Sequence, residues 1–237
     1  MRVPAIQGLI RRRLLINFRV APERLQPLLL AGLRPLAVDG WGIAGICLIR
    51  LEAVRPAGFP AWTGLSSENG AHRIAVAWEG GEGVYIPRRD TDAALNRLAG
   101  GRLFPGAQHR AAFEVAEADG RIGIRMDCAD GQGSVAVEAA ATETFPHGSV
   151  LGDLEAASRF FRRGSLGYSP DRRGQCLDGL ELEAEDWSMQ PLAVQSLTST
   201  FFDDPRRFPP GSLALDSAFL MRDVAHRWVS RPPFPKA

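Results

Sequence analysis

The chain has 237 residues, of which 45% are hydrophobic and 23% are charged, and its formal net charge is +1 at pH 7. This length and composition are typical of one large globular domain that buries most of its apolar surface. A net charge this close to zero provides no general attraction to nucleic acid, so we expect no nucleic-acid partner.

The apolar stretches are too short for export or for a membrane span. Only three apolar residues follow Arg13 before Asn17, and the longest uncharged run, 40–49, is about half the length of a membrane span. The cysteines lie far apart, without a CxxC pair, at positions 47, 128 and 176. We therefore expect a cytoplasmic protein with reduced thiols and no membrane partner.

Short apolar stretches between frequent glycines and prolines predict many strands joined by turns. In chain order, we expect strands over residues 14–20, 41–51, 72–78, 83–86, 180–184, 194–201 and 212–222. Helix start and stop signals predict helices over residues 22–31, 91–99 and 151–163. The sequence predicts one domain over residues 1–230, followed by a proline-rich, loosely ordered tail, RPPFPKA, at 231–237.

The stretch FEVAEADGRIGIRMDCADGQGSVAVEAAATE, which begins at Phe113, has the clearest strand pattern. Apolar residues alternate with polar ones, and the pairs Asp119-Gly120 and Asp130-Gly131 interrupt the alternation. Asp-Gly supplies the positive φ angles that tight hairpin turns need. The pattern predicts a three-stranded antiparallel meander.

Several common site motifs are absent from the sequence. It contains no GxSxG, no GxxxxGK[ST] and no HExxH, and its one GxG, at 131–133, precedes a strand. The four histidines include no pair with the i,i+4 spacing of metal ligands. We expect no metal and no cofactor.

Three polar clusters remain as candidate sites. The first, SSENGAHRIAV, places Glu68, Asn69, His72 and Arg73 within six residues, which is enough for acid–base chemistry. The alternative is a solvated loop with one salt bridge.

The second cluster, GVYIPRRDTD, places Arg88 and Arg89 after a strand, where they could bind an anion or lie in water. The third cluster, GGRLFPGAQHR, contains Arg102, Gln108 and His109. Its alternative is a tight turn between a helix and a strand.

Several segments together resemble the uncharacterised DUF2071 family of the acetoacetate decarboxylase-like superfamily. The resemblance covers nearly the whole chain, and the block 64–106 is the most specific part. The segments are RRRLLINFRVAPERLQPLL, DGWGIAGICLIRL, GLSSENGAHRIAVAW, EGVYIPRRDTDAALNRLAGGRLFPG and SAFLMRDVAHRW. Within the block, Glu68 matches a glutamate of the decarboxylases, and VYIP, DTDAA, GR and FP match their later elements.

The chain departs from the decarboxylases where they carry two lysines, because these positions are Gly106 and Ala107 here. The family mechanism needs a lysine amine to form a Schiff base with a keto acid. The only lysine is Lys236, one residue from the end. The sequence therefore excludes acetoacetate decarboxylation through a Schiff base.

The resemblance implies a mostly β, α+β fold, in which a bent antiparallel sheet closes into a cone or partial barrel with a few short peripheral helices. It also implies a cavity for a small anionic or carbonyl-containing molecule. We expect Glu68 and His72 as catalytic groups there. The expected substrate-binding residues are Arg73, Arg88, Arg89, Arg102, Gln108 and His109, and at least one of Arg88, Arg89 and Arg102 should face Glu68.

Two classes of function follow from this reading. The first is a lysine-independent, lyase-like enzyme that acts on a small carboxylate or carbonyl compound. The alternative is a ligand-binding or scaffold protein without catalysis. Edge strands of such sheets can pair between subunits, which leaves a homo-oligomer open.

Overall fold

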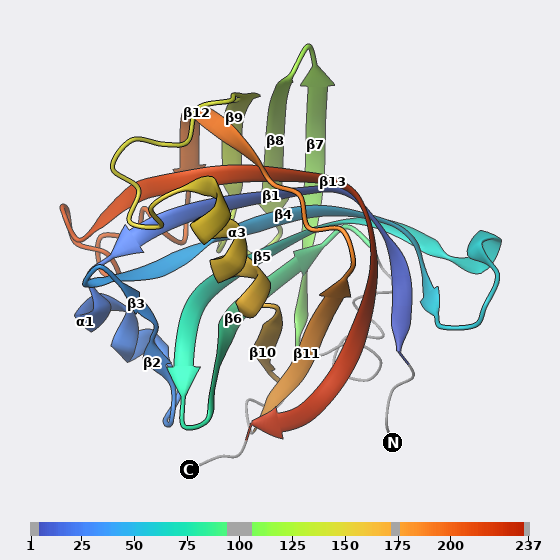
Figure 1. Cartoon of the computed structure of the whole chain (residues 1–237), viewed down its shortest axis with the longest axis horizontal. Helices are drawn as coiled ribbons and strands as arrows, with labels where there is room; N and C mark the ends of the chain where they lie inside the picture. The colour runs from blue at the N-terminus through green and yellow to red at the C-terminus, as the bar shows by residue number, and fades with distance from the viewer. Residues whose placement is uncertain (1–4, 94–105, 172–175, 235–237) are drawn as a thin grey trace.

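The computed structural model describes residues 5–93, 106–171 and 176–234 (Figure 1). Within these ranges the chain is mostly β-strand and has two short α-helices, as the sequence predicts. The strands belong to one thirteen-stranded sheet.

Long strands form a central layer that crosses the middle of Figure 1. Neighbours in this layer pair antiparallel. In spatial order they are β13 (Leu213–Phe234), β1 (Ile6–Val20), β4 (Trp41–Pro56), β5 (Leu65–Trp78) and β6 (Gly81–Thr91).

The sheet closes on one side of this layer through two short strands. Strand β6 pairs with β10 (Leu166–Pro170), β10 pairs with β11 (Leu177–Ala184), and β11 returns to β13. These strands and the central layer form a first closed ring.

A second closure lies on the other side. From β6 it runs in order through β7 (Gln108–Ala118), β8 (Arg121–Cys128), β9 (Val135–Ala141) and β12 (Gln190–Ser199) back to β13. The expected bent, closing sheet is therefore confirmed. It is not antiparallel throughout, because β6 pairs parallel with both β7 and β10.

Both faces of the central layer are buried. Leu14 and Ile16 pack into the core between this layer and the β7–β9 strands, whereas Leu15 packs toward the helix α3. Strands buried on both faces have continuous apolar runs rather than alternation. This explains the sequences LLI in β1 and GIAGICLI in β4.

The predicted meander is confirmed. Strands β7, β8 and β9 pair antiparallel, and Ala118 lies opposite Arg121. The two turn residues between them, Asp119 and Gly120, have φ angles of 50° and 73°. These positive angles are those of a two-residue hairpin turn.

The helices are shorter than the sequence predicts. The expected helix at 22–31 is a single turn, α1 (Pro22–Leu25), followed by the 3-10 turn η1 (Gln26–Leu28). The expected helix at 151–163 is α3 (Leu154–Arg163), whose N-cap Asp153 accepts a hydrogen bond from the Ala156 amide. The expected helix at 91–99 lies mostly outside the described residues, and Thr91 itself ends β6.

Several strands are longer than predicted, which changes the setting of the candidate residues. Strand β5 begins at Leu65, so Glu68 and Asn69 lie in the sheet and not in a loop. Strand β6 runs to Thr91 and contains both arginines that were expected after its end. Strand β13 pairs with β11 up to Phe234, so residues 231–234 are strand and not tail.

The remaining elements are small. Strand β2 (Arg34–Pro35) pairs with the end of β5, and β3 (Ala37–Val38) pairs with the start of β4. The 3-10 turn η2 (Ala61–Thr63) lies between β4 and β5. No described helix is long and apolar enough to cross a membrane.

Candidate functional site

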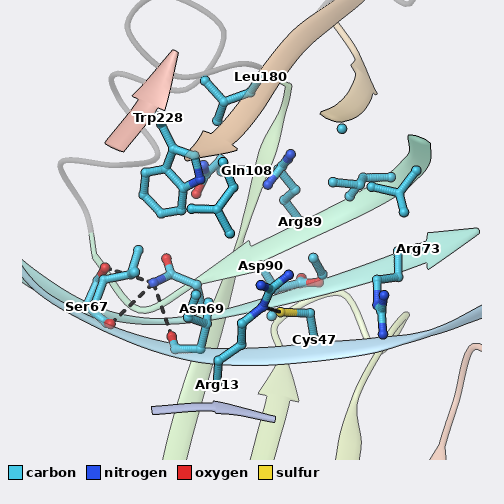
Figure 2. A pocket seen from close by; sticks show the side chains of 18 of the residues that line it. Arg13, Cys47, Ser67, Asn69, Arg73, Arg89, Asp90, Gln108, Leu180 and Trp228 are labelled. Atoms are coloured by element: carbon cyan, nitrogen blue, oxygen red, sulfur yellow. Dashed lines mark hydrogen bonds between the residues drawn. The ribbon is translucent and has the colours of Figure 1, made fainter. Parts of the chain in front are cut away.

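A cavity of about 140 Å³ lies inside the ring that β10 and β11 close. Its walls come from β1, β4, β5, β6, β10, β11 and β13, with Phe161 of α3 at one side. Most of the wall is apolar, and its apolar residues include Ile49, Val84, Leu182 and Trp228. Figure 2 shows the polar side chains that enter this space.

Three arginines from three different strands line the cavity: Arg13 of β1, Arg73 of β5 and Arg89 of β6 (Figure 2). The Arg13 Nε donates to the Cys47 sulfur at 3.4 Å, and its guanidinium lies 5.4 Å from the ring centre of Trp187. No described carboxylate forms an ion pair with any of the three arginines.

The other two arginines are held by neutral groups. Arg73 donates to the Oδ1 of Asn17 and lies 4.9 Å from the ring centre of Phe161. Arg89 donates from Nε to the Ser169 hydroxyl at 2.9 Å. Removal from water lowers the pKa of both Arg73 and Arg89 to about 10. Both therefore remain charged at neutral pH.

Asp90 is the only carboxylic acid among the described lining residues, and its charge is already engaged. Both Asp90 oxygens accept hydrogen bonds from Arg88, the shortest at 2.7 Å. The cavity therefore has an excess of positive charge within a mostly apolar wall. Such an arrangement is costly unless an anion compensates it.

Two amide side chains complete the polar lining. The Asn69 amide donates to the Ser67 backbone oxygen and hydroxyl, which fixes its orientation (Figure 2). Gln108, at the start of β7, lies across the cavity from it. The guanidiniums and the Gln108 amide offer hydrogen-bond donors to oxygen atoms of a ligand.

The sequence-predicted site residues separate into two groups. Arg73, Arg89 and Gln108 line the cavity. Glu68, His72, Arg88 and His109 are not among the lining residues. Arg102 lies outside the described residues.

Glu68 faces the opposite side of the central layer. Its Oε2 lies 2.7 Å from the Arg12 Nη2, and Arg12 also binds Glu117 at 2.7 Å. Burial raises the pKa of Glu68 above its usual value, although Arg12 and Arg50 oppose this shift. The expectation that one of the described candidate arginines pairs with Glu68 is wrong, because its partners are Arg12 and, at 4.0 Å, Arg50.

His72 is fully buried on that same opposite side. Its ring packs 4.7 Å from the ring of Phe201 and 5.9 Å from that of Phe202, and neither ring nitrogen has a hydrogen-bond partner among the described residues. Burial, and more weakly Arg88 and Arg207, lower the pKa of His72 to about 3. The ring is therefore neutral at ordinary pH and has an apolar packing role.

Arg88 and His109 belong to a separate charged cluster next to the β8–β9 turn. Arg88 binds Asp90 at 2.7 Å and Asp130 at 2.8 Å, and the Nδ1 of His109 lies 3.6 Å from Asp130. The Cys128 thiol lies 3.3 Å from Asp90. This cluster ties β6 to the end of β8, and of its members only Asp90 lines the cavity.

Sequence reasoning did not single out Arg13 or Cys47 as site residues. Both residues lie on the same face of the sheet, because Arg13 shares a face of β1 with Leu15, and Cys47 lies opposite Leu15 on β4. Because both faces of these strands are buried, alternation alone cannot tell which face holds a cavity.

No group of three described His, Cys, Asp or Glu side chains is arranged to hold a metal ion. Apart from Asp90, which Arg88 engages, the charged groups that line the cavity are guanidiniums, which suit an anion.

A model of the DUF2071 family, described as an uncharacterized conserved protein, matches residues 9–214. No curated protein matches the chain. The fold is similar to the crystal structure of acetoacetate decarboxylase from Legionella pneumophila subsp. pneumophila str. Philadelphia 1, with a TM-score of 0.67 and 11% identity over 98% of this chain and 89% of the other.

Two further solved structures are similar. An acetoacetate decarboxylase-like enzyme from Sphingomonas wittichii RW1 has a TM-score of 0.65 and 15% identity over 100% of this chain and 95% of the other. The enduracididine biosynthesis enzyme MppR, complexed with pyruvate, has a TM-score of 0.64 and 12% identity over 100% and 91%. At these identities the similarity shows a shared fold.

Proposed function

The chain belongs to the DUF2071 family, and from this membership and its cavity we propose that it binds a small carboxylate in the space between Arg13, Arg73 and Arg89. The observation that carries the proposal is the set of three guanidiniums without an ion pair to any described carboxylate in a mostly apolar cavity. A carboxylate would compensate the buried positive charge and accept charge-assisted hydrogen bonds.

The size of the cavity limits the ligand. A cavity of about 150 Å³ is known to hold one benzene molecule, and this one has about 140 Å³. A ligand of about six non-hydrogen atoms therefore fits, which is the size of pyruvate. One protein of similar fold is complexed with pyruvate, which supports a ligand of this kind.

A lyase that used Glu68 or His72 is less well supported, because neither group lines the cavity. A Schiff base is equally unsupported, because the described lining contains no lysine. We therefore propose binding of the carboxylate as the function of Arg13, Arg73, Arg89 and Gln108.

Isothermal titration with matched anionic and neutral ligands tests the proposal. We expect acetate and pyruvate to bind saturably and their neutral counterparts, acetamide and acetone, not to bind. A bound carboxylate at about 100 times its Kd should also stabilise the fold by about 2.7 kcal/mol and raise the Tm. Equal binding of acetamide and acetate, or no binding of either carboxylate, would contradict the proposal.

Variants separate the cavity from general charge effects. Arg89→Met removes one guanidinium from the cavity and should weaken carboxylate binding. Arg125→Met is the matched control, because Arg125 is exposed on β8 and pairs with Asp127 at 2.8 Å. The control carries the same change in net charge and should bind carboxylates as the unmodified protein does.

A further inference from the structure

Cys47 occupies an unusual position for a cysteine of a buried strand. It lies in the middle of β4, is 8% exposed, and lines the cavity next to the Arg13 guanidinium (Figure 2). The Arg13 Nε donates a hydrogen bond to its sulfur at 3.4 Å. The sulfur is therefore the acceptor in a contact with a cation, and such a contact stabilises a thiolate.

The other two cavity arginines extend this positive environment. Arg73 and Arg89 line the same cavity as Cys47, so two further guanidiniums contribute positive charge to it. Arg73 is more than nine-tenths buried, and its Nε has no hydrogen-bond partner among the described residues. The charge of this buried guanidinium has no described carboxylate partner, and an anion in the cavity would compensate it.

Cys128 shows the contrast within the same chain. It is also 8% exposed, but its nearest charged partner is the carboxylate of Asp90 at 3.3 Å. Burial and Asp90 raise the pKa of Cys128 to about 12. Two equally exposed thiols thus have different hydrogen-bond partners, a guanidinium donor at Cys47 and a carboxylate acceptor at Cys128.

We propose that Cys47 is the nucleophile of the cavity and that it reacts with small carboxylates that carry an electrophilic carbon next to the carboxylate. This inference rests on the proposed function, because the arginines must first bind the carboxylate. A carboxylate held by the Arg13 guanidinium, which itself contacts the sulfur, has its adjacent carbon close to that sulfur. Binding then supplies proximity in addition to the cationic hydrogen-bond donor at the sulfur.

Iodoacetate is a probe of this class, and its reaction is simple. The Cys47 sulfur attacks the CH₂ carbon, a carbon–sulfur bond forms, the carbon–iodine bond breaks, and iodide leaves with the bonding electron pair. The thiol proton passes to the buffer. Iodoacetamide undergoes the same displacement, has nearly the same shape and lacks the negative charge.

The test compares the two reagents on the full chain with glutathione in the same solution, and measures the rate at each cysteine by peptide mass spectrometry. We expect the ratio of the iodoacetate rate to the iodoacetamide rate to be at least about tenfold higher at Cys47 than at glutathione, the factor that about 1.4 kcal/mol of selective binding provides. Cys128 should react with neither reagent.

A measurement on the unmodified protein avoids variants that could misfold. Acetate should slow the reaction of Cys47 with iodoacetamide, because it occupies the same cavity. In Arg89→Met, which circular dichroism should show to be folded, the preference for iodoacetate should fall. Lack of protection by acetate, or a rate ratio at Cys47 no higher than that of glutathione, would overturn the assignment.

The outcomes also separate this inference from the proposed function. If titration shows that acetate binds but Cys47 is not modified by iodoacetate, the nucleophile assignment is wrong and the carboxylate site stands. If acetate does not bind at all, both proposals fail.

Discussion

Arg12 and Glu68 form a buried ion pair, with 2.7 Å between Nη2 and Oε2, on the face of the central layer opposite the cavity. Their side chains are only 5% and 11% exposed. Adjacent residues of β1 therefore have different roles, because Arg12 compensates a buried carboxylate while Arg13 lines the cavity. Breaking a buried pair by removing one partner is costly, since the other charge stays behind.

Replacing Arg12 with Met should lower the free energy of unfolding by about 3 kcal/mol or more at pH 7, because Glu68 keeps its charge without its main partner. The loss should be smaller at pH 5. Burial already raises the pKa of Glu68, and without Arg12 the carboxyl can become protonated and neutral. Urea denaturation at both pH values measures the effect.

Arg11→Met is the matched control for this variant. Arg11 is the preceding residue, is 49% exposed, and pairs with Glu52 and Asp223 on the surface. Exposed pairs contribute little to stability, so this change should leave the unfolding midpoint nearly unchanged. Equal losses in the two variants would show that burial of the Arg12–Glu68 pair does not determine its contribution.

The buried imidazole of His72 should make stability depend on pH. Its pKa is about 3 in the folded protein, against an ordinary value of 6.5. Between these pH values the unfolded chain therefore binds a proton at this histidine and the folded protein does not. The stability that neutral His72 contributes is lost as pH falls from about 6.5 toward 3. For one proton, the free energy of unfolding changes with pH by about 1.4 kcal/mol per pH unit.

His72→Phe should reduce this slope between pH 6.5 and 4.5 by about one proton, or about 1.4 kcal/mol per pH unit. Phenylalanine suits the site, because the His72 ring packs against Phe201 and Phe202 and has no described hydrogen-bond partner. The exposed His147 provides a control in His147→Asn, which should keep the original slope. Urea denaturation across this pH range decides between the two results.

Much of the fold could be predicted from local patterns. The meander follows from alternating apolar residues and from Asp119-Gly120, whose positive φ angles the turn requires. Strand ends were less predictable. β5 continues back to Leu65 and β6 forward to Thr91, because tertiary pairing with β4 and β7 extends strands beyond their apolar segments.

The candidate site was harder to predict because a bulge changes which residues of β6 face the cavity. Val84 and Ile86 face it, so simple alternation would place Arg88 there too. The register of β6 against β5 shifts around Pro87, between the pairs Ile74–Tyr85 and His72–Arg88. The extra residue moves Arg88 to the opposite face and brings Arg89 into the cavity.

Pyruvate followed by borohydride should leave no adduct on an internal residue, because the only lysine is Lys236, near the C-terminus. Borohydride traps an imine only where an amine has reacted with the carbonyl. Mass spectrometry of the intact protein and of its peptides provides the measurement. A stoichiometric adduct anywhere other than the N-terminus or Lys236 would require a chemistry that the sequence does not provide.

Glu68→Gln should lower stability without changing ligand binding, whereas Arg89→Met should weaken ligand binding. Glu68 faces away from the cavity toward Arg12, so the Gln variant should be less stable but should bind acetate with unchanged affinity.

Arg89 lines the cavity and has no described ion-pair partner. Its replacement should weaken acetate binding at least about tenfold, the effect of losing one charge-assisted hydrogen bond of about 1.5–3 kcal/mol. Titration of both variants at a temperature where both are folded distinguishes the two faces, and weaker acetate binding in Glu68→Gln alone would restore the glutamate as a residue of the site.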